Sequence, residues 1–271
     1  MDRLENKKLA IIGGGHIGLA LAEGFLNSGK ISGSQLVVSN PSLSKIIYLK
    51  KYGVEVTSDN KVAAGKADWV FIAVKPSVVG RVMAEISHLL ERKLIISLAA
   101  VITIDTLRGY IKNAEIIRII PNMAISCNQG VVGLITDGKS KKQIGQLLST
   151  LGIVVEVEKE ADLDTLTLLS GCGPAIVSQF MEFLVNYGIK LGLSSDRSYK
   201  LVLQTFKGTE AFLENSGISS NQLIHSVATK GGITEVILTR LQQNGFQEKF
   251  IQAMNSGCVK IKELGKILNN E

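Results

Sequence analysis

The sequence predicts an α/β protein in which a doubly wound parallel sheet is followed by an all-helical domain. Short apolar runs alternate with helical patterns over the first 160 residues, a glycine-rich turn follows the first run, and strand patterns end near residue 160. We therefore divide the 271 residues into two domains, 1–160 and 161–271. Both fit the usual domain size of about 100–200 residues.

The first domain has the alternating pattern of a parallel sheet. The run KLAII at residues 8–12 stops at glycines, as a buried parallel strand does, and residues 16–27 follow with helical spacing. Ser42 predicts the N-cap of a helix that reaches Lys51. The remaining predicted elements are a helix over residues 78–90, strands over residues 35–39, 69–74, 94–97 and 114–119, and late edge strands over residues 131–135 and 154–157, for which an antiparallel direction stays open.

The second domain contains only helical patterns. Apolar residues recur at helical intervals over residues 174–191, 195–213, 236–243 and 247–267. Many of these helices are apolar on more than one face, and a small domain of that kind often buries the surplus against a partner subunit. We expect a homo-oligomer formed through this domain; packing on the sheet domain alone is the alternative.

A glycine turn, Gly13-x-Gly15-x-x-Gly18, directly follows the first strand and opens the first helix. In a Rossmann-type domain the first glycine allows the tight bend, the second admits a pyrophosphate, and the third lets the helix pack on the strand. The helix N-terminus adds N–H groups and a positive dipole end for the anion. The context predicts a dinucleotide site.

The end of the second strand distinguishes the two nicotinamide cofactors. A carboxylate there would hold the ribose 2′-hydroxyl of NAD, whereas this chain has Ser39 and Asn40. The hydroxyl of Ser39 and the amide of Asn40 would accommodate a 2′-phosphate, because neither side chain carries a negative charge that repels it. We therefore expect NADPH, with NADH as a second option. Lys75 and Pro76 end the third predicted strand at the same, ligand-binding edge of the sheet.

The helical domain carries two glycine clusters, SGCGPA at residues 170–175 and TKGGIT at residues 229–234, each before a helix. The second could form an anion-binding turn, although a simple helix cap is the competing interpretation. Of the three histidines, His16, His88 and His225, the first lies inside the phosphate turn and the second on a predicted surface helix, and neither is an evident general base for alcohol oxidation. Reduction of a protonated imine needs only positioning and one hydrogen-bonding group.

Composition argues against several other classes. The net charge is +6, but lysines and arginines are dispersed, so no nucleic-acid partner is expected. Cys127, Cys172 and Cys258 are far apart without C-x-x-C spacing, which argues against a disulfide framework and a metal site. The first eight residues lack an apolar signal segment, and the apolar stretch 94–104 is too short to span a bilayer. We expect a cytoplasmic protein without a membrane partner.

The chain resembles the pyrroline-5-carboxylate reductase family from end to end. The motifs that carry the resemblance are GGGHIG at the N-terminus, VFIAVKP (70–76), RIIPN (118–122), LSGCGPA (169–175) and ATKGGIT (228–234). The resemblance implies an NADPH-dependent oxidoreductase that reduces the imine 1-pyrroline-5-carboxylate to L-proline, the last step of proline biosynthesis. It also implies a small imino acid as substrate and a homodimer, or an assembly of dimers, formed through the helical domain.

The resemblance also assigns site residues. The cofactor-binding positions it implies are Gly13, Gly14, Gly15, His16, Ile17, Gly18, Ser39, Asn40, Asn60, Ala73, Val74, Lys75, Pro76, Ala99 and Ala100. The substrate-binding positions are Lys230, Gly231, Gly232, Ile233 and Thr234. The glycine pair would hold the substrate carboxylate, and Thr234, the implied catalytic residue, would hydrogen-bond the ring nitrogen.

Several positions depart from the family pattern. Lys230 stands where the family usually has proline, Ile233 where it commonly has threonine, and Val101 where it has glycine. The other departures are Cys172 for serine, Met123-Ala124 for Thr-Pro, and His225 for an acidic residue. Two alternatives therefore stay open: a divergent paralogue that reduces another imino acid, and a non-catalytic NADP-binding regulatory protein.

Overall fold

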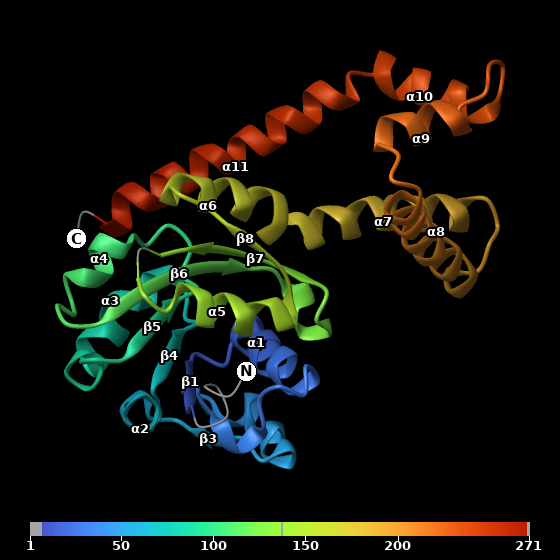
Figure 1. Cartoon of the computed structure of the whole chain (residues 1–271). Coiled ribbons are helices and arrows are strands. Elements are labelled where there is room, and N and C mark those ends of the chain that lie inside the picture. Colours follow the sequence, from blue (N-terminus) through green and yellow to red (C-terminus); the bar gives the residue numbers. More distant parts are fainter. Residues whose placement is uncertain (1–6, 137, 270–271) are drawn as a thin grey trace. The chain divides into compact units, whose positions relative to one another are not determined.

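The computed structural model describes residues 7–136 and 138–269, which form two compact units (Figure 1). The first unit runs up to Pro174 and resumes at Cys258, and the second is Ala175–Gly257. The last helix of the chain therefore begins in the second unit and ends in the first.

Within the described residues, the first unit is built on an eight-stranded sheet of order β3-β2-β1-β4-β5-β6-β7-β8. Strands β1 to β6 are parallel, β7 runs antiparallel to β6, and β8 is parallel to β7. The strands are β1 (Leu9–Ile12), β2 (Leu36–Ser39), β3 (Glu55–Thr57), β4 (Trp69–Ile72), β5 (Leu94–Ser97), β6 (Glu115–Pro121), β7 (Gly130–Ile135) and β8 (Gly152–Glu156). The predicted α/β class is confirmed, including an antiparallel edge.

Helices cover both faces of this sheet. Alternate residues of a strand point to opposite faces, so Leu9 and Ile11 of β1 belong to one core and Ala10 and Ile12 to the other. The first core is closed by α1 (His16–Asn27) and α5 (Lys141–Leu148), the second by α2 (Asn60–Lys66), α3 (Pro76–Ile86) and α4 (Ile104–Arg108). After β8 follow α6 (Glu160–Leu166) and a π-helical segment, Thr167–Gly171.

One predicted helix is wrong. In place of a helix from Ser42 to Lys51, the chain forms two 3-10 segments, Leu43–Lys45 and Ile47–Tyr52. The Ser42 side chain caps neither segment; its hydroxyl contacts that of Ser44 at 2.9 Å. The short strand β3 and the helix α9 were not predicted.

The second unit contains only helical elements in its described residues, as the sequence predicts. They are α7 (Gly173–Lys190), α8 (Ser195–Ser216), α9 (Ser220–Val227), α10 (Ile233–Gln243) and the start of α11 (Phe246–Asn269). Many large apolar side chains of this unit are exposed, among them Phe183, Tyr187 and Leu191 of α7 and its C-terminal end.

One continuous helical stretch, Glu160–Lys190, is long and apolar enough to cross a membrane by length and composition. Its mean hydropathy is 1.4, and 6% of its most apolar window is buried. A helix that packs on a partner subunit has the same composition, so the stretch is weak evidence for a membrane span.

Candidate active site

The phosphate turn begins where β1 ends, and each of its three motif glycines has a separate structural reason. Gly13 has φ +108°, and a Cβ there would lie 2.7 Å from the carbonyl oxygen of Ala73. A Cβ on Gly18 would lie 1.9 Å from the carbonyl oxygen of Gly13, so α1 packs directly on the turn. A Cβ on Gly15 would meet no protein atom within 4 Å. Side-chain atoms would therefore clash with the protein at Gly13 and Gly18, whereas the space beside Gly15 is open.

The N-terminus of α1 is suited to an anion. Its N-cap is Gly15, no side chain of the described residues caps it, and its first turn carries no acidic residue. The N–H groups of this turn and the helix dipole are left to bind a phosphate. These features fit the pyrophosphate of a dinucleotide.

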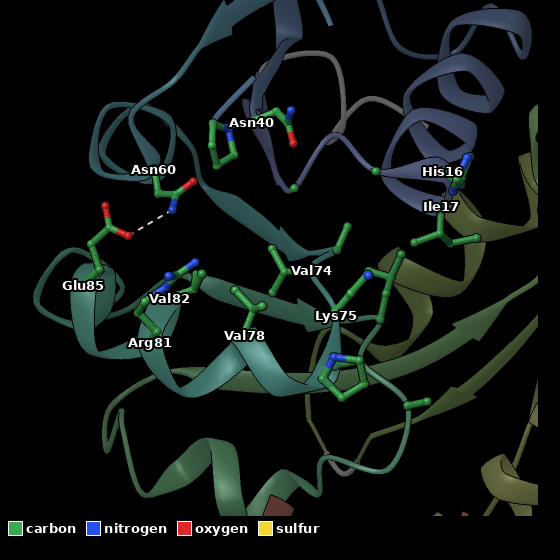
Figure 2. A pocket seen from close by; sticks show the side chains of 18 of the residues that line it. His16, Ile17, Asn40, Asn60, Val74, Lys75, Val78, Arg81, Val82 and Glu85 are labelled. Atoms are coloured by element: carbon green, nitrogen blue, oxygen red, sulfur yellow. Dashed lines mark hydrogen bonds between the residues drawn. The ribbon is translucent and has the colours of Figure 1, made fainter. Parts of the chain in front are cut away.

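A cavity of about 760 Å³ opens beside this turn (Figure 2). It is larger than a single small metabolite needs and matches the usual volume of a cofactor site. Predicted residues on its surface are Gly13, Gly15, His16, Ile17, Asn40, Asn60, Ala73, Val74, Lys75, Pro76, Ala99 and Ala100. The structure thus brings together twelve of the fifteen predicted cofactor positions in one cavity.

The other three predicted positions lie outside the cavity surface. Ser39 is fully buried, and its hydroxyl donates a 2.8 Å hydrogen bond to Oδ1 of Asn60. Nδ2 of Asn60 donates to Oε2 of Glu85 at 3.0 Å, as the dashed line in Figure 2 shows. Both the oxygen and the nitrogen of the Asn60 side-chain amide are therefore hydrogen-bonded. Gly14 and Gly18 also lie outside the cavity surface.

Helix α3 forms a side of the cavity that the sequence prediction missed. Val78, Arg81, Val82 and Glu85 all line it and follow one another at helical spacings of three, one and three. The signal was available, because residues at i, i+3, i+4 and i+7 share one helix face. Pro41, Ser58, Leu98 and Met123 complete the cavity surface.

Arg81 is the most informative of the missed residues. It lines the cavity together with Asn40, Ser58 and Asn60, which come from the ends of β2, β3 and the start of α2 (Figure 2). Its guanidinium makes no ion pair with any residue that the structure describes. A cation near the end of β2 favours a 2′-phosphate.

The predicted substrate residues lie in the second unit, at the turn before α10. Gly231 has φ +75°, and Gly232 is the N-cap of the helix. The N–H of Gly231 donates to Oε2 of Glu235 at 2.6 Å, so this turn already holds a carboxylate. Lys230 is exposed, and Ile233 is 83% exposed.

Thr234 is half-buried beside an apolar hollow of about 350 Å³. The hollow is lined by side chains of α8, α9 and α10, including Leu213, Leu223 and Leu238. No residue in the described part of the chain hydrogen-bonds the Thr234 hydroxyl, which leaves it available to a ligand.

Two of the sequence motifs are joined by hydrogen bonds. Oδ1 of Asn122, at the end of RIIPN, accepts from the N–H groups of Ala124 and Val131, both at 3.2 Å. Its Nδ2 donates to the Ser170 hydroxyl at 3.1 Å, in the first glycine cluster. Asn122 and the first cluster therefore have a structural role in this chain.

The first residue of RIIPN, Arg118, forms a partly buried ion pair. Arg118 of β6 is 2% exposed and pairs with Glu160 of α6, whose Oε1 also accepts from the N–H of Ile104 at 3.0 Å. Burial raises the pKa of the nearby Asp164 carboxyl, against the opposing effect of Arg118. Among the described residues no three His, Cys, Asp or Glu side chains form a metal-binding group.

Comparison with known proteins agrees with this geometry. Residues 160–264 match the family model for pyrroline-5-carboxylate reductase dimerisation, and residues 8–101 match that for NADP oxidoreductase, coenzyme F420-dependent. The chain is 33% identical over 264 residues to pyrroline-5-carboxylate reductase 3 of Danio rerio, covering 95% of this chain and 91% of the relative. The chain belongs to the pyrroline-5-carboxylate reductase family.

Other reductases of this family are equally similar along the whole chain. The enzyme of Corynebacterium melassecola is 31% identical over 95% of this chain and 98% of its own length. The crystal structure of Plasmodium falciparum pyrroline carboxylate reductase with NADP bound superposes with a TM-score of 0.88 at 34% identity, covering 96% of this chain and 99% of the other. The predicted family and the NADP cofactor are thereby confirmed.

The departures from the reductase pattern now have places in the fold. Met123 lines the cofactor cavity, and Cys172 is exposed at the end of the π-helical segment. His225 lies on α9, where its Nδ1 is 2.7 Å from the carbonyl oxygen of Asn221. Val101 has the left-handed backbone conformation, φ +62°, that usually calls for glycine.

Proposed function

We propose that this protein reduces 1-pyrroline-5-carboxylate to L-proline with NADPH. The observation that supports this best is a chain 33% identical to a pyrroline-5-carboxylate reductase over 95% of its length, with a cavity beside its glycine turn in which Asn40, and not a carboxylate, follows β2. The proposed cofactor residues are the predicted set, of which Ser39, Gly14 and Gly18 lie outside the cavity surface.

Bound NADPH supplies the hydride that is added to the imine carbon. The residues of the chain bind and orient the reactants: the phosphate turn holds the pyrophosphate, and Ala99 and Ala100 leave room for a flat ring. In the second unit, the turn at Gly231 and Gly232 binds the substrate carboxylate. Lys230 and Ile233 flank it. The Thr234 hydroxyl is proposed as the hydrogen-bonding group at the ring nitrogen.

A homo-oligomer formed through the helical half, as a dimer or an assembly of dimers, is part of the proposal. The match of residues 160–264 to a dimerisation model supports it, as do the exposed apolar residues of α7. We propose that the apolar stretch Glu160–Lys190 also packs against a partner subunit. On this proposal the protein is soluble and cytoplasmic. The division into a cofactor domain of residues 1–160 and a substrate domain of residues 161–271 stays a prediction.

A turnover assay tests the function. Purified protein is mixed with the imine and NADPH, and absorbance loss is followed over a range of pH. NADH and a panel of other imino acids form parallel arms. Turnover of another imino acid alone would identify the divergent paralogue, which the departures Lys230, Ile233 and Met123 favour. NADPH binding without any turnover would identify a regulatory protein.

Arg81→Met is expected to raise KM for NADPH about tenfold and to leave KM for NADH unchanged. The reason is that Arg81 lines the cavity and makes no ion pair within the described part of the chain, and a charge-assisted hydrogen bond to a 2′-phosphate is worth about 1.5–3 kcal/mol. Steady-state kinetics with both cofactors measures the effect. Lys61→Met is the matched control, because Lys61 lies on α2 outside the cavity surface. Equal changes for both cofactors would contradict the assignment.

Glu235→Ala is expected to lower KM for the imine about threefold, because its carboxylate occupies the Gly231 N–H that the substrate carboxylate would use. The kcat value should stay within about twofold. Glu248→Ala, in the first turn of α11, controls for the loss of a helix-terminal charge. An increase in KM would show that Glu235 supports the turn rather than competes for it.

A further inference from the structure

The loop after β5 forms part of the cofactor cavity and contains a strained residue. Leu98, Ala99 and Ala100 line the cavity, and Val101 follows them. Val101 has φ +62° and is 6% exposed. A β-branched residue is a rare and costly occupant of the left-handed region. A free loop would therefore tend to relax, and a changed backbone at Val101 would move the neighbouring Ala100 and Ala99.

A single side chain from the far end of the sequence holds this loop. Nδ2 of Asn269, in the last turn of α11, donates to the carbonyl oxygen of Val101 at 2.7 Å. Its Oδ1 accepts from the N–H of Thr103 at 3.0 Å and from the Thr106 hydroxyl at 2.7 Å. The Asn269 amide thus bonds the chain on both sides of Ile102. All of these groups belong to the first unit.

We propose that Asn269 is a positioning residue that keeps residues 98–101 in the conformation that binds NADPH. Asn269 itself lies outside the cavity surface, so its action on the cofactor goes through Val101. The bonded carbonyl fixes the peptide that follows Val101, and the bonds to Thr103 and Thr106 fix the start of α4. Without these bonds, a fraction of the molecules would hold the loop in a relaxed conformation, and the apparent affinity would fall by that fraction.

The test measures the NADPH dissociation constant by fluorescence titration, with thermal unfolding followed on the same samples. Asn269→Ala is expected to raise the dissociation constant about tenfold, which corresponds to about 1.4 kcal/mol. Lys266→Ala, an exposed residue in the same helix turn, is the matched control and should bind like the wild type.

Val101→Gly is the second variant tested. Glycine adopts φ +62° without strain, so the loop no longer needs the hydrogen bonds of Asn269 to keep its conformation. In the Val101→Gly background, Asn269→Ala should change the dissociation constant by less than about twofold. If Asn269 only stabilises the fold, Asn269→Ala would raise the dissociation constant by the same factor in both backgrounds, and that result would overturn the proposal. An unchanged dissociation constant for Asn269→Ala in the wild-type background would overturn it as well.

If Asn269→Ala does not fold, Asn269→Asp takes its place. The aspartate keeps an acceptor for Thr103 and Thr106 but has no donor for the Val101 carbonyl. The same tenfold increase is then expected, and wild-type affinity would overturn the proposal. The inference rests on the NADPH binding that is part of the proposed function. Because the readout is cofactor binding without substrate, it is independent of whether the imine is turned over.

Discussion

Gly15→Ala is expected to weaken NADPH binding about a hundredfold while the protein stays folded. The added Cβ would meet no protein atom within 4 Å, so the fold tolerates it. Gly15 lines the cofactor cavity, however, and its backbone is where a pyrophosphate approaches α1. A methyl group in that space costs on the order of 1–3 kcal/mol of overpacking against the phosphate, and the upper end of that range is about a hundredfold in affinity.

Calorimetric titration of NADPH and thermal unfolding measure the two parts of this prediction. The melting temperature should fall by only a few degrees, because alanine is a poorer N-cap than glycine. Gly145→Ala is the matched control: it also meets open space, lies on α5 and is remote from the cavity surface. Near-normal NADPH affinity for Gly15→Ala would remove the phosphate-binding role of the turn.

The sheet was predictable because buried parallel strands have short, uninterrupted apolar sequences. Strands β1 and β5 are fully buried four-residue runs, and α1 begins and ends where its helical spacing does. Strand β3, by contrast, consists of the partly exposed residues EVT, and α9 is short and largely polar. Three residues are too few to leave a periodic signal for β3, whereas α9 had a signal that the prediction missed: Ser219 and Gln222 form a capping box, and Leu223 and Val227 share one helix face.

The site was predictable where local motifs define it and not where distant elements meet. The glycine turn and the AVKP motif account for eight of the twelve predicted residues on the cavity surface. The motif carries no information on burial. Ser39 was therefore expected on the cavity surface, whereas it is fully buried and hydrogen-bonded to Asn60. The bond between Asn269 and Val101 spans 168 residues, and no local pattern indicates it. Positive φ at Val101 does explain, however, why glycine is the expected residue there.

Thr234→Val is expected to reduce kcat for the imine by roughly a hundredfold and to leave NADPH affinity unchanged. Valine keeps the shape of threonine and removes only its hydroxyl, which is proposed to hydrogen-bond the ring nitrogen. The apolar hollow beside Thr234 accepts the extra methyl group, so the fold should persist. NADPH binding reports on the first unit, which contains the glycine turn, so thermal unfolding is measured as well to check the second unit, which contains α10.

Single-turnover kinetics at saturating NADPH separates the chemical step from substrate binding. Thr234→Ser should recover most of the rate, because it restores the hydroxyl without the methyl group. Thr239→Val is the matched control, on the same helix and exposed to solvent. If Thr234→Val turns over at the wild-type rate, the hydroxyl has no role at the nitrogen. The turn at Gly231 and Gly232 would then hold the substrate through its carboxylate, and catalysis would depend on positioning alone.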